Sequence, residues 1–407
     1  MIHSDQSAET SAHRLSMKEF TIMLASLIAT VAFSIDAMLP ALGEIAEELS
    51  PGNIERGQMI LTVFVFGMGG GTLFVGPLSD AIGRRMTLLI GIGIYLAGSV
   101  MAIFANSLEA LLIARFIQGA GAASPRLVPM ALVRDLYAGR EMARVTSIIM
   151  MIFIIVPALA PSIGAAIMAL SDWRGIFYAF CLFGLIGVSW LFLRQPETLP
   201  PSRRRPLRVA SLMAGLREVL ADRQVRLYIV ILTLGFGQMF AALSSAPQLY
   251  AAYGITDTFP VWFAIGALLA GSVSFINSRI VVRVGMRRIV GVAYRLQVVI
   301  SAVTLVLLVA GLPQNSWGFA VFFVYFVSVF AMAGITFGNL NALAMQNMGH
   351  LAGMAASIIT ALSTMGAAVL ATPVGLAFNG TAVPIACATL VCSLIAAFLM
   401  RYTQNDS

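Results

Sequence analysis

The stretch Gly76-Pro77-Leu78-Ser79-Asp80-Ala81-Ile82-Gly83-Arg84-Arg85-Met86 is a short charged turn between two apolar runs. Residues 58–75 precede it and residues 86–105 follow it, and neither run contains a charged side chain. So short a polar connection forces the two runs to lie side by side in opposite directions. Antiparallel apolar segments that meet at a charged turn are typical of helices that cross a membrane, with the charged side chains at one membrane face.

The composition extends this interpretation to the whole chain. Hydrophobic residues make up 59% of the 407 residues and charged residues 11%, whereas a soluble domain holds about 25% charged residues. Such a chain uses lipid as its solvent, and its length allows about twelve helices of ~20 residues with short loops. The net charge of +7 comes largely from arginines in the loops, and this pattern favours membrane orientation over nucleic-acid binding.

The apolar runs fall into two sets of six. The first set lies near residues 19–42, 57–79, 86–105, 109–133, 142–170 and 173–194, and the second near 226–249, 260–282, 288–311, 317–345, 351–378 and 381–400. Between them, residues 194–226 are rich in proline and arginine. We therefore predict an all-α membrane protein with twelve transmembrane helices. Its expected parts are a cytoplasmic tail at 1–18, a six-helix bundle at 19–195, a basic linker at 196–225, a second six-helix bundle at 226–401 and a tail at 402–407.

The loop charges predict the orientation. Basic side chains gather in the loops at one face, namely Lys18, Arg84, Arg85, Arg134, Arg140, Arg144, the linker arginines, Arg279, Arg283, Arg287, Arg288 and Arg401. Acidic side chains gather in the loops at the other face, namely Glu44, Glu47, Glu48, Glu55, Glu109, Asp172 and Asp257. Because positively charged loops stay in the cytoplasm, we expect both termini and the linker to be cytoplasmic.

The charged turn resembles the loop between the second and third helices of the major facilitator superfamily, whose pattern is Gly-x-Leu-x-Asp-x-x-Gly-Arg-Arg/Lys. Every anchor position of that pattern is present, and Ala81 departs from it where many members carry a basic residue. The resemblance implies a charge lock that holds the cytoplasmic gate shut. Its expected residues are Gly76, Asp80, Gly83, Arg84 and Arg85, with Arg134 and Asp135 at the inner end of the fourth helix.

The second half of the chain repeats part of this turn. The sequence Arg283-Val284-Gly285-Met286-Arg287-Arg288 lies at the corresponding place, but Val282 stands where Asp80 is found in the first half. Parallel repeats of this kind are what the facilitator fold predicts. The gating carboxylate is therefore expected in the first half alone.

Asp36 lies deep in the first apolar run, within Phe33-Ser34-Ile35-Asp36-Ala37-Met38-Leu39-Pro40. A charge inside a span is costly and marks a functional site. Burial disfavours the ionised carboxylate and a nearby cation favours it, so Asp36 is suited to carry a proton. The segment resembles the Asp-x-Tyr-Leu-Pro sequence of Bcr/CflA-type drug–proton antiporters, with Met38 in place of tyrosine. An aspartate at the outer end of the helix is the alternative, because Glu44 follows about two turns later.

The fourth run contains Arg115-Phe116-Ile117-Gln118-Gly119, which resembles the family's Arg-x-x-Gln-Gly motif. Arg115 and Asp36 both lie toward the outer ends of their helices, so we expect them at similar depth, as partners in proton coupling. Small residues after Gln118 allow close approach of other helices. The alternative is an arginine that snorkels outward.

Arg126 lies on nearly the same face of that helix as Arg115, about three turns further toward the cytoplasm. It is not part of the family pattern. A second cation facing the cavity indicates an anionic or zwitterionic substrate group, or a second partner for Asp36. A structural arginine bonded to carbonyls freed by Pro125 and Pro129 is the alternative.

The fifth run contains Val156-Pro157-Ala158-Leu159-Ala160-Pro161-Ser162-Ile163-Gly164-Ala165. It resembles the antiporter motif Gly-Pro-x-x-Gly-Gly: Pro161 and Gly164 match, whereas Ala160 and Ala165 replace glycines. The motif is associated with exporters. Pro157 and Pro161 are expected to kink the helix where it packs on the second bundle.

The second half offers fewer polar candidates. Gln238, Asn339 and Asn341 are expected to line the cavity, with interhelical hydrogen bonding as the alternative for each. The predicted substrate-binding set is completed by Phe33, Gln118 and Arg126 of the first half. Because the sequence contains no Gly-x-Ser-x-Gly and no metal-ligand spacing, we expect neither an enzyme nor a metal or cofactor.

These features together predict a proton-coupled secondary transporter in the inner membrane of a bacterium. The resemblance implies a multidrug-type efflux antiporter that exports small amphipathic molecules by alternating access. Its expected partners are a small-molecule substrate, protons and the lipid bilayer, without nucleic acid, and we expect a monomer. The alternative is a proton-coupled transporter, in the uptake direction, of one small anionic or zwitterionic metabolite.

Overall fold

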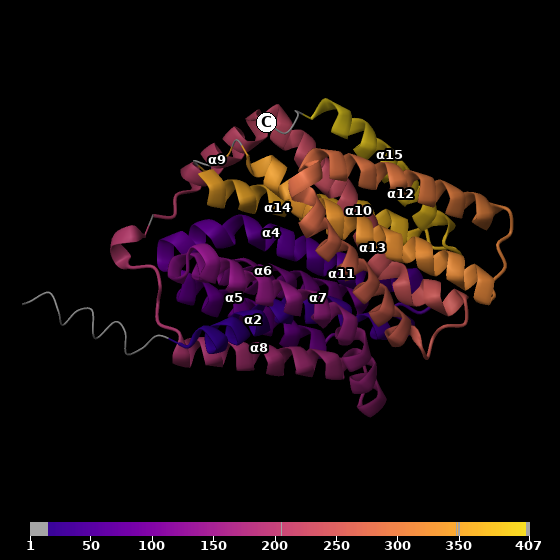
Figure 1. Ribbon diagram of the computed structural model, residues 1–407. Helices are drawn as coiled ribbons and strands as arrows, with labels where there is room; N and C mark the ends of the chain where they lie inside the picture. Colours follow the sequence, from indigo (N-terminus) through magenta and orange to yellow (C-terminus); the bar gives the residue numbers. More distant parts are fainter. Residues whose placement is uncertain (1–14, 205, 347, 349–350, 404–407) are drawn as a thin grey trace, which may run out of the picture.

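The computed structural model describes residues 15–204, 206–346, 348 and 351–403, and their regular elements are all helices (Figure 1). The first part of the chain forms α2 (Met17–Asp36), α3 (Leu42–Leu49), α4 (Met59–Ile82), α5 (Arg84–Ile103), α6 (Leu108–Leu136), α7 (Gly139–Leu170) and α8 (Arg174–Arg194). The second part forms α9 (Val209–Ala221), α10 (Arg223–Ala252), α11 (Phe259–Val284), α12 (Met286–Val309), α13 (Ser316–Met345), α14 (Ala352–Leu376) and α15 (Val383–Leu399). The all-α prediction is confirmed.

Ten helical segments within the described residues are long and apolar enough to cross a membrane. The long helices α6 and α7 are not among them, although Figure 1 shows both running alongside their apolar neighbours. The helix α6 is less apolar than these segments, since it contains Glu109, Arg115, Arg126, Arg134 and Asp135 as well as two prolines. The described part of α7 contributes a shorter apolar stretch, Ile155–Leu170. The chain is thus a multi-pass membrane protein.

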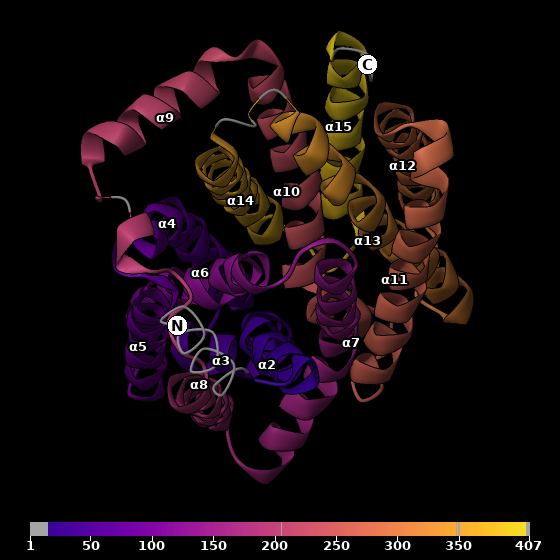
Figure 2. The same ribbon diagram turned by 60° about the vertical axis from the view of Figure 1, so that its left-hand side comes forward.

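The helices pack in two groups that follow the order of the sequence. In the first, α6 lies against α4 and α5, and α2 packs on α6, α7 and α8. In the second, α10 packs on α13, α14 and α15, and α12 on α13 and α15. The groups touch mainly where α4 meets α14 and α7 meets α11 (Figure 2). The predicted packing of the fifth apolar run on the second half is therefore confirmed.

The connection between α4 and α5 is shorter than predicted. Residues 76–82 continue α4, with Pro77 inside the helix, and Gly83 alone separates α4 from α5. Gly83 has φ 100° and ψ 162°, and Gly285, which alone separates α11 from α12, has φ 86° and ψ 143°. Side chains other than hydrogen are strained in this region of backbone space. The same uncommon turn thus recurs where the sequence predicted a repeat.

The segment between the two groups contains a helix of its own. After α8, residues 195–208 include the short 3₁₀ turn Pro201–Arg203, and α9 follows. Asp222 caps α10, because its carboxylate accepts hydrogen bonds from the backbone N–H groups of Gln224 and Val225. Figure 2 shows α9 at the edge of the molecule, beyond the ends of α4 and α14.

We expect Gly83→Ala to destabilise the protein by about 1–3 kcal/mol, because alanine would be held at a positive φ. Its methyl group would also collide with the carboxylate of Glu197. The measurement is the Tm of the detergent-solubilised protein. Gly93→Ala is the control, since Gly93 lies inside α5 with open space around its Cα. A Gly83→Ala variant with the Tm of the wild type would show that the turn tolerates a side chain.

Candidate functional site

Asp36 is a buried carboxylate inside the first membrane segment. It is the last residue of α2, and its residue is 6% exposed. The helical path continues through the turn Leu39–Ala41 into α3, so Met17–Leu49 forms one apolar segment. Exposed Glu44 follows eight residues later, about 12 Å along a helix. Asp36 therefore ends a helix, as one alternative expected, but it lies within the protein.

The carboxylate of Asp36 forms no ion pair with any residue that the structure describes. Beside it, α7 approaches α2 very closely, because a Cβ on Gly164 would collide with the carbonyl oxygen of Ala37. Gly164 and Pro161 are both buried, and Pro157 lies one turn earlier in the same helix. The fifth-helix motif thus places a glycine against the residue that follows Asp36.

Arg115 is completely buried in α6 and is satisfied without a carboxylate. Its Nε donates to the carbonyl oxygen of Ile60 at 3.2 Å, and its Nη2 donates to that of Ser34 at 3.1 Å. Its Nη1 donates to Oε1 of Gln118, and the guanidinium carbon lies 4.2 Å from the centre of the Phe64 ring. The snorkelling alternative is therefore wrong. Arg115 ties α2, α4 and α6 together, and its contact on α2 is two residues before Asp36.

A chain of polar groups extends from Arg115 into neighbouring helices. Nε2 of Gln118 donates to Oγ of Ser99 at 2.7 Å. The hydroxyls of Ser34 and Tyr95 lie 2.6 Å apart. Gln118, predicted as a substrate-binding residue, is completely buried in this network. The structure therefore places Gln118 as a support for Arg115.

Arg126 contrasts with Arg115. Among the described residues, its guanidinium makes one long hydrogen bond, from Nη1 to Sδ of Met68 at 3.7 Å. It forms no ion pair with any of these residues. The alternative of a structural arginine predicted hydrogen bonds to backbone carbonyls near Pro125 and Pro129. The acceptor in the described residues is instead the sulfur of Met68. Arg126 is thus a half-buried cation with a weak acceptor.

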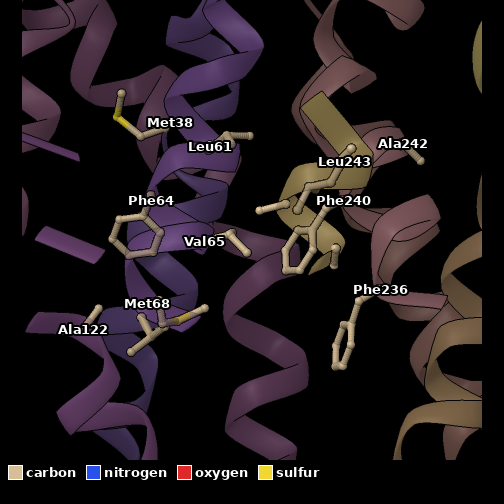
Figure 3. Close-up of a cluster of buried hydrophobic side chains, with 14 of the residues drawn as sticks. Met38, Leu61, Phe64, Val65, Met68, Ala122, Phe236, Phe240, Ala242 and Leu243 are labelled. Carbon is tan, nitrogen blue, oxygen red and sulfur yellow. The ribbon is translucent and has the colours of Figure 1, made fainter. Parts of the chain in front are cut away.

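Apolar side chains from both halves surround the region of Met68. Figure 3 shows Val65 of α4 and Phe240 of α10 turned toward each other, with Met68 one turn below Val65. In the second half, the rings of Phe236 and Phe337 lie against each other at a tilt of 35°, with centres 3.8 Å apart. The arrangement is a hydrophobic interface between the halves, with one cation, Arg126, on its first-half side.

The charged residues of the predicted gate form a compact cluster at the ends of α4, α5 and α6. Arg84 pairs with Asp80 and, at 3.0 Å, with Asp135, and it donates to Oγ of Ser79. Arg85 instead donates to the carbonyl oxygen of Phe192 at 2.6 Å and lies over the Phe192 ring. Within the described residues, these pairs join elements of the first half to one another. The pairs of Arg84 with Asp80 and Asp135 join the turn to the end of α6, as expected for the predicted residues. That the cluster acts as a gate stays a prediction.

Glu197 completes this cluster and was missed by the sequence analysis. Its carboxylate accepts hydrogen bonds from the backbone N–H groups of Arg84 and Arg85, each at 3.0 Å, and so caps the start of α5. Thr198, its neighbour, donates to Asp135 at 2.8 Å. An acidic residue shortly after α8 gives no local sign of this role, because the contact spans more than a hundred residues.

A cavity of about 370 Å³ lies beside the charged cluster, between the first and second halves. Asp80, Arg84 and Arg134 line it from the first half, and Ser357 and Thr360 of α14 line it from the second. A Cβ on Gly76 would lie 2.7 Å from Oγ of Ser357. Gly76 thus allows α4 and α14 to meet at the edge of the cavity.

The opposite end of this interface is joined by hydrogen bonds. Oε1 of Gln58, just before α4, accepts from Oγ of Ser245 at 2.7 Å, and its Nε2 donates to Gln248. Gln248 donates in turn to the carbonyl oxygen of Ile54 at 3.3 Å. Gln58 is 3% exposed. These bonds fasten the first half to α10 on the side that carries Glu44 and Glu55, and the sequence analysis did not identify them.

The remaining predicted substrate residues lie elsewhere. Phe33 packs against Phe180 and Phe183 of α8. Gln238 is completely buried and accepts from Ser393 of α15 at 3.1 Å. Asn339 donates to Asn277 of α11, and Asn341 to the carbonyl oxygen of Phe337. The side-chain amides of Gln238, Asn339 and Asn341 thus form hydrogen bonds between or within helices, as polar side chains inside a membrane span commonly do.

Comparison with known proteins identifies the family. The model of the major facilitator superfamily matches residues 22–371, and the chain therefore belongs to that superfamily. It is a membrane transporter rather than an enzyme.

Among curated relatives, YdgK of Bacillus subtilis (strain 168), an uncharacterized MFS-type transporter, is 32% identical over 392 residues, which are 95% of this chain and 94% of YdgK. The bicyclomycin resistance protein homolog of Haemophilus influenzae is 31% identical over 344 residues, 84% of each chain. Multidrug resistance protein D of Escherichia coli (strain K12) is 28% identical over 223 residues, 54% of this chain and 55% of that protein. These relatives confirm the predicted resemblance to Bcr/CflA-type transporters.

Two solved structures share the fold. The D-xylose–proton symporter superposes with a TM-score of 0.71 at 16% identity, over 95% of this chain and 98% of that chain. The human organic anion transporter MFSD10 (TETRAN) superposes with a TM-score of 0.67 at 16% identity, over 95% and 100%. At this identity the likeness concerns the fold alone.

We expect Gln58→Ala to loosen the junction with α10, because it removes hydrogen bonds that contribute about 0.5–1.5 kcal/mol each. Spin labels at Glu47 and Thr256, exposed on either side of the junction, should then report a larger share of long distances. Gln195→Ala is the control, since Gln195 is a similarly buried amide that donates to the carbonyl of its neighbour Pro196. Identical distance distributions for Gln58→Ala and the wild type would contradict this role.

Proposed function

We propose that this protein is a proton-coupled antiporter that exports small amphipathic molecules by alternating access. The observation that carries the proposal is Asp36, a buried carboxylate without an ion-pair partner among the described residues. An uncompensated buried charge is so costly that the group changes its protonation instead. Each time its surroundings switch between dry and wet, Asp36 therefore takes up or releases a proton.

Arg115 is proposed to stabilise the ionised form of Asp36 in the state that has released its proton. Its guanidinium already contacts the carbonyl of Ser34, two residues from Asp36. In a second conformation, a small movement of α2 against α6 brings the Asp36 carboxylate to this cation, which favours the ionised form. Gly164 of α7 also packs directly against Ala37, the residue that follows Asp36. Asp36 thus responds to movements of both α6 and α7.

The proposed topology has twelve membrane spans in two six-helix bundles, since α6 and α7 run beside the ten apolar segments. A charged helix is tolerated there because its neighbours cover Arg115. The proposed parts are those predicted from the sequence, 19–195 and 226–401, with the linker 196–225 between them. Both termini and the basic loops are assigned to the cytoplasm, and the protein to a bacterial inner membrane as a monomer.

With this orientation, we assign the conformation to a state that faces the cytoplasm. Gln58, Ser245 and Gln248 hold the outer side together, whereas the cavity beside Asp80 and Arg134 lies at the inner side. We assign the outer gate to the Gln58 junction. The cluster of Asp80, Arg84 and Asp135 is poised to meet the second half when that cavity closes.

The proposed substrate region is the interface around Met68. Methionine side chains adapt to varied apolar shapes, phenylalanine rings add apolar surface, and Arg126 offers a cation with donors left for a ligand. This composition suits amphipathic molecules with an acidic or strongly accepting group. The relatives named for bicyclomycin resistance and multidrug resistance support export as the direction.

We expect the wild-type chain, in a drug-sensitive bacterial host, to raise the inhibitory concentration of bicyclomycin or another amphipathic antibiotic. Asp36→Asn should abolish this increase, because the amide binds no proton in exchange. It should also abolish substrate-driven proton movement in everted vesicles. Glu44→Gln is the control, since Glu44 is an exposed carboxylate on the same segment. Full pH-gradient-driven efflux by Asp36→Asn would exclude Asp36 as the proton carrier.

We expect Arg126→Lys to weaken binding of an anionic amphipathic probe by about tenfold, because lysine lacks the bidentate fork of arginine. Binding of a cationic probe of the same shape should change little. The measurement is the affinity of the purified protein for both probes, with Arg134→Lys as the control on the same helix. Equal losses for both probes would assign Arg126 a structural role.

Uptake of one anionic or zwitterionic metabolite remains the second candidate, favoured by the cation at Arg126. Cellular accumulation of the probe separates the two. An exporter lowers the internal concentration relative to cells without the protein, and an importer raises it.

A further inference from the structure

A second cavity, of about 840 Å³, lies away from the proposed substrate region, between α12 and α15. Four arginines line it: Arg287, Arg288 and Arg295 of α12, and Arg401 just after α15. The rest of its lining is apolar, with Val299 of α12 and Phe398 of α15 as large exposed members. Figures 1 and 2 show these helices side by side at the periphery of the second half. The cavity therefore faces the lipid rather than the transport path.

The arginines of this pocket fall into two kinds. Arg287 is anchored: its guanidinium donates to Oγ of Thr403 at 2.9 Å and to the carbonyl oxygen of Met400 at 3.2 Å. Arg288, Arg295 and Arg401 are exposed, and none forms an ion pair with a carboxylate among the described residues. Three cations thus share one pocket without recorded counter-charges.

Arg295 is the most informative of them because of its depth. It lies nine residues after the start of α12, about 14 Å along the helix. Its neighbours Leu296 and Val299 are each 58% exposed, so this face of α12 meets the acyl chains of lipids. Nε of Arg295 donates to the carbonyl oxygen of Gly291 at 2.9 Å. The side chain therefore turns back toward the charged end of α12, into the pocket.

We propose that this pocket binds the headgroup of an anionic phospholipid, with its acyl chains along Val299 and Phe398. Phosphate oxygens accept hydrogen bonds from several guanidinium groups at once, and such a partner removes the cost of an arginine at membrane depth. The apolar side of the pocket, which includes Val299 and Phe398, suits an acyl chain. Free phosphate has no acyl chain and would leave that side uncovered. Basic pockets between helices at the cytoplasmic face are suited to anionic lipids. The assignment to that leaflet rests on the proposed orientation.

The test uses the full-length protein in detergent and counts retained lipids by native mass spectrometry. The probes are phosphatidylglycerol, diphosphatidylglycerol and the zwitterionic phosphatidylethanolamine, with inorganic phosphate as a competitor. We expect the wild type to retain the two anionic lipids, and Arg288→Gln combined with Arg295→Gln to weaken that retention about tenfold or more. Millimolar inorganic phosphate should leave lipid retention unchanged, because it makes no contact with the apolar side of the pocket.

The matched control is Arg279→Gln combined with Arg283→Gln. These arginines lie at the same end of the neighbouring helix α11 and do not line the pocket; Arg279 lies over Phe275 instead. The control removes the same charge from the same face and should keep the wild-type affinity. If the double variant of the pocket is unstable, Arg295→Gln and Arg401→Gln singly replace it, each with a smaller loss expected.

Equal losses in the pocket and control variants would overturn the proposal, because they would reflect net charge alone. Equal retention of phosphatidylethanolamine, or displacement of the lipid by inorganic phosphate, would overturn it as well. Transport assays do not enter these readouts, so the result is independent of the proposed direction and substrate.

Discussion

A polar group inside a membrane has to find its partner within the protein, because the lipid offers none. In the first half of this chain, Arg115 meets that condition completely, through two backbone carbonyls, one amide and one aromatic ring. Three helices are fixed by the contacts of a single guanidinium. The close packing of α6 makes this possible: side chains at Gly119 and Gly121 would collide with the backbones of Phe64 and Tyr95. The rest of the half is arranged around this buried cation.

Two other polar groups in the first half differ from Arg115, because they lack an oppositely charged partner among the described residues. Asp36 lies two residues after the Ser34 carbonyl that Arg115 contacts, and Arg126 lies about three turns along α6 from Arg115. Neither Asp36 nor Arg126 has an ion pair in the described part of the chain. A structural polar group is retained for the bonds that it makes. A group kept in the membrane without such bonds is retained for what it does in another state, or with a ligand. This contrast is the physical basis for assigning proton exchange to Asp36 and substrate contact to Arg126.

The two ends of the interface between the halves are built differently, and the proposed alternating access depends on that difference. At the end near Glu55, amide and hydroxyl groups of Gln58, Ser245 and Gln248 bond directly across the halves. At the other end, the ion pairs of Arg84 stay within the first half, and a cavity lined by both halves lies beside them. Neutral hydrogen bonds of this kind are weak enough to break in a transport cycle. The charged cluster instead links helices of the first half to one another.

The sequence by itself determined the helical class, the multi-pass membrane character and the family, because hydropathy and turn motifs are local. A run such as 86–105 is long and apolar enough to be a membrane helix wherever it lies, and the charged motif around Gly83 marks a turn between two such runs. The candidate site was predicted in outline: Asp36, Arg115 and the cluster of Asp80 and Arg84 could all be found from their motifs. Their partners could not be found in this way.

Only the tertiary structure decided which polar groups meet. Glu197 caps α5 from a distant segment, Gln58 joins α10, and Gln238 turns to Ser393 instead of the cavity. Helix periodicity tells which residues share a face, but the rotation and depth of each helix follow from packing against its neighbours. A carboxamide in an apolar run is equally compatible with a cavity and with a neighbouring helix. The choice depends on side-chain contacts between residues far apart in the chain, and these are absent from any local pattern.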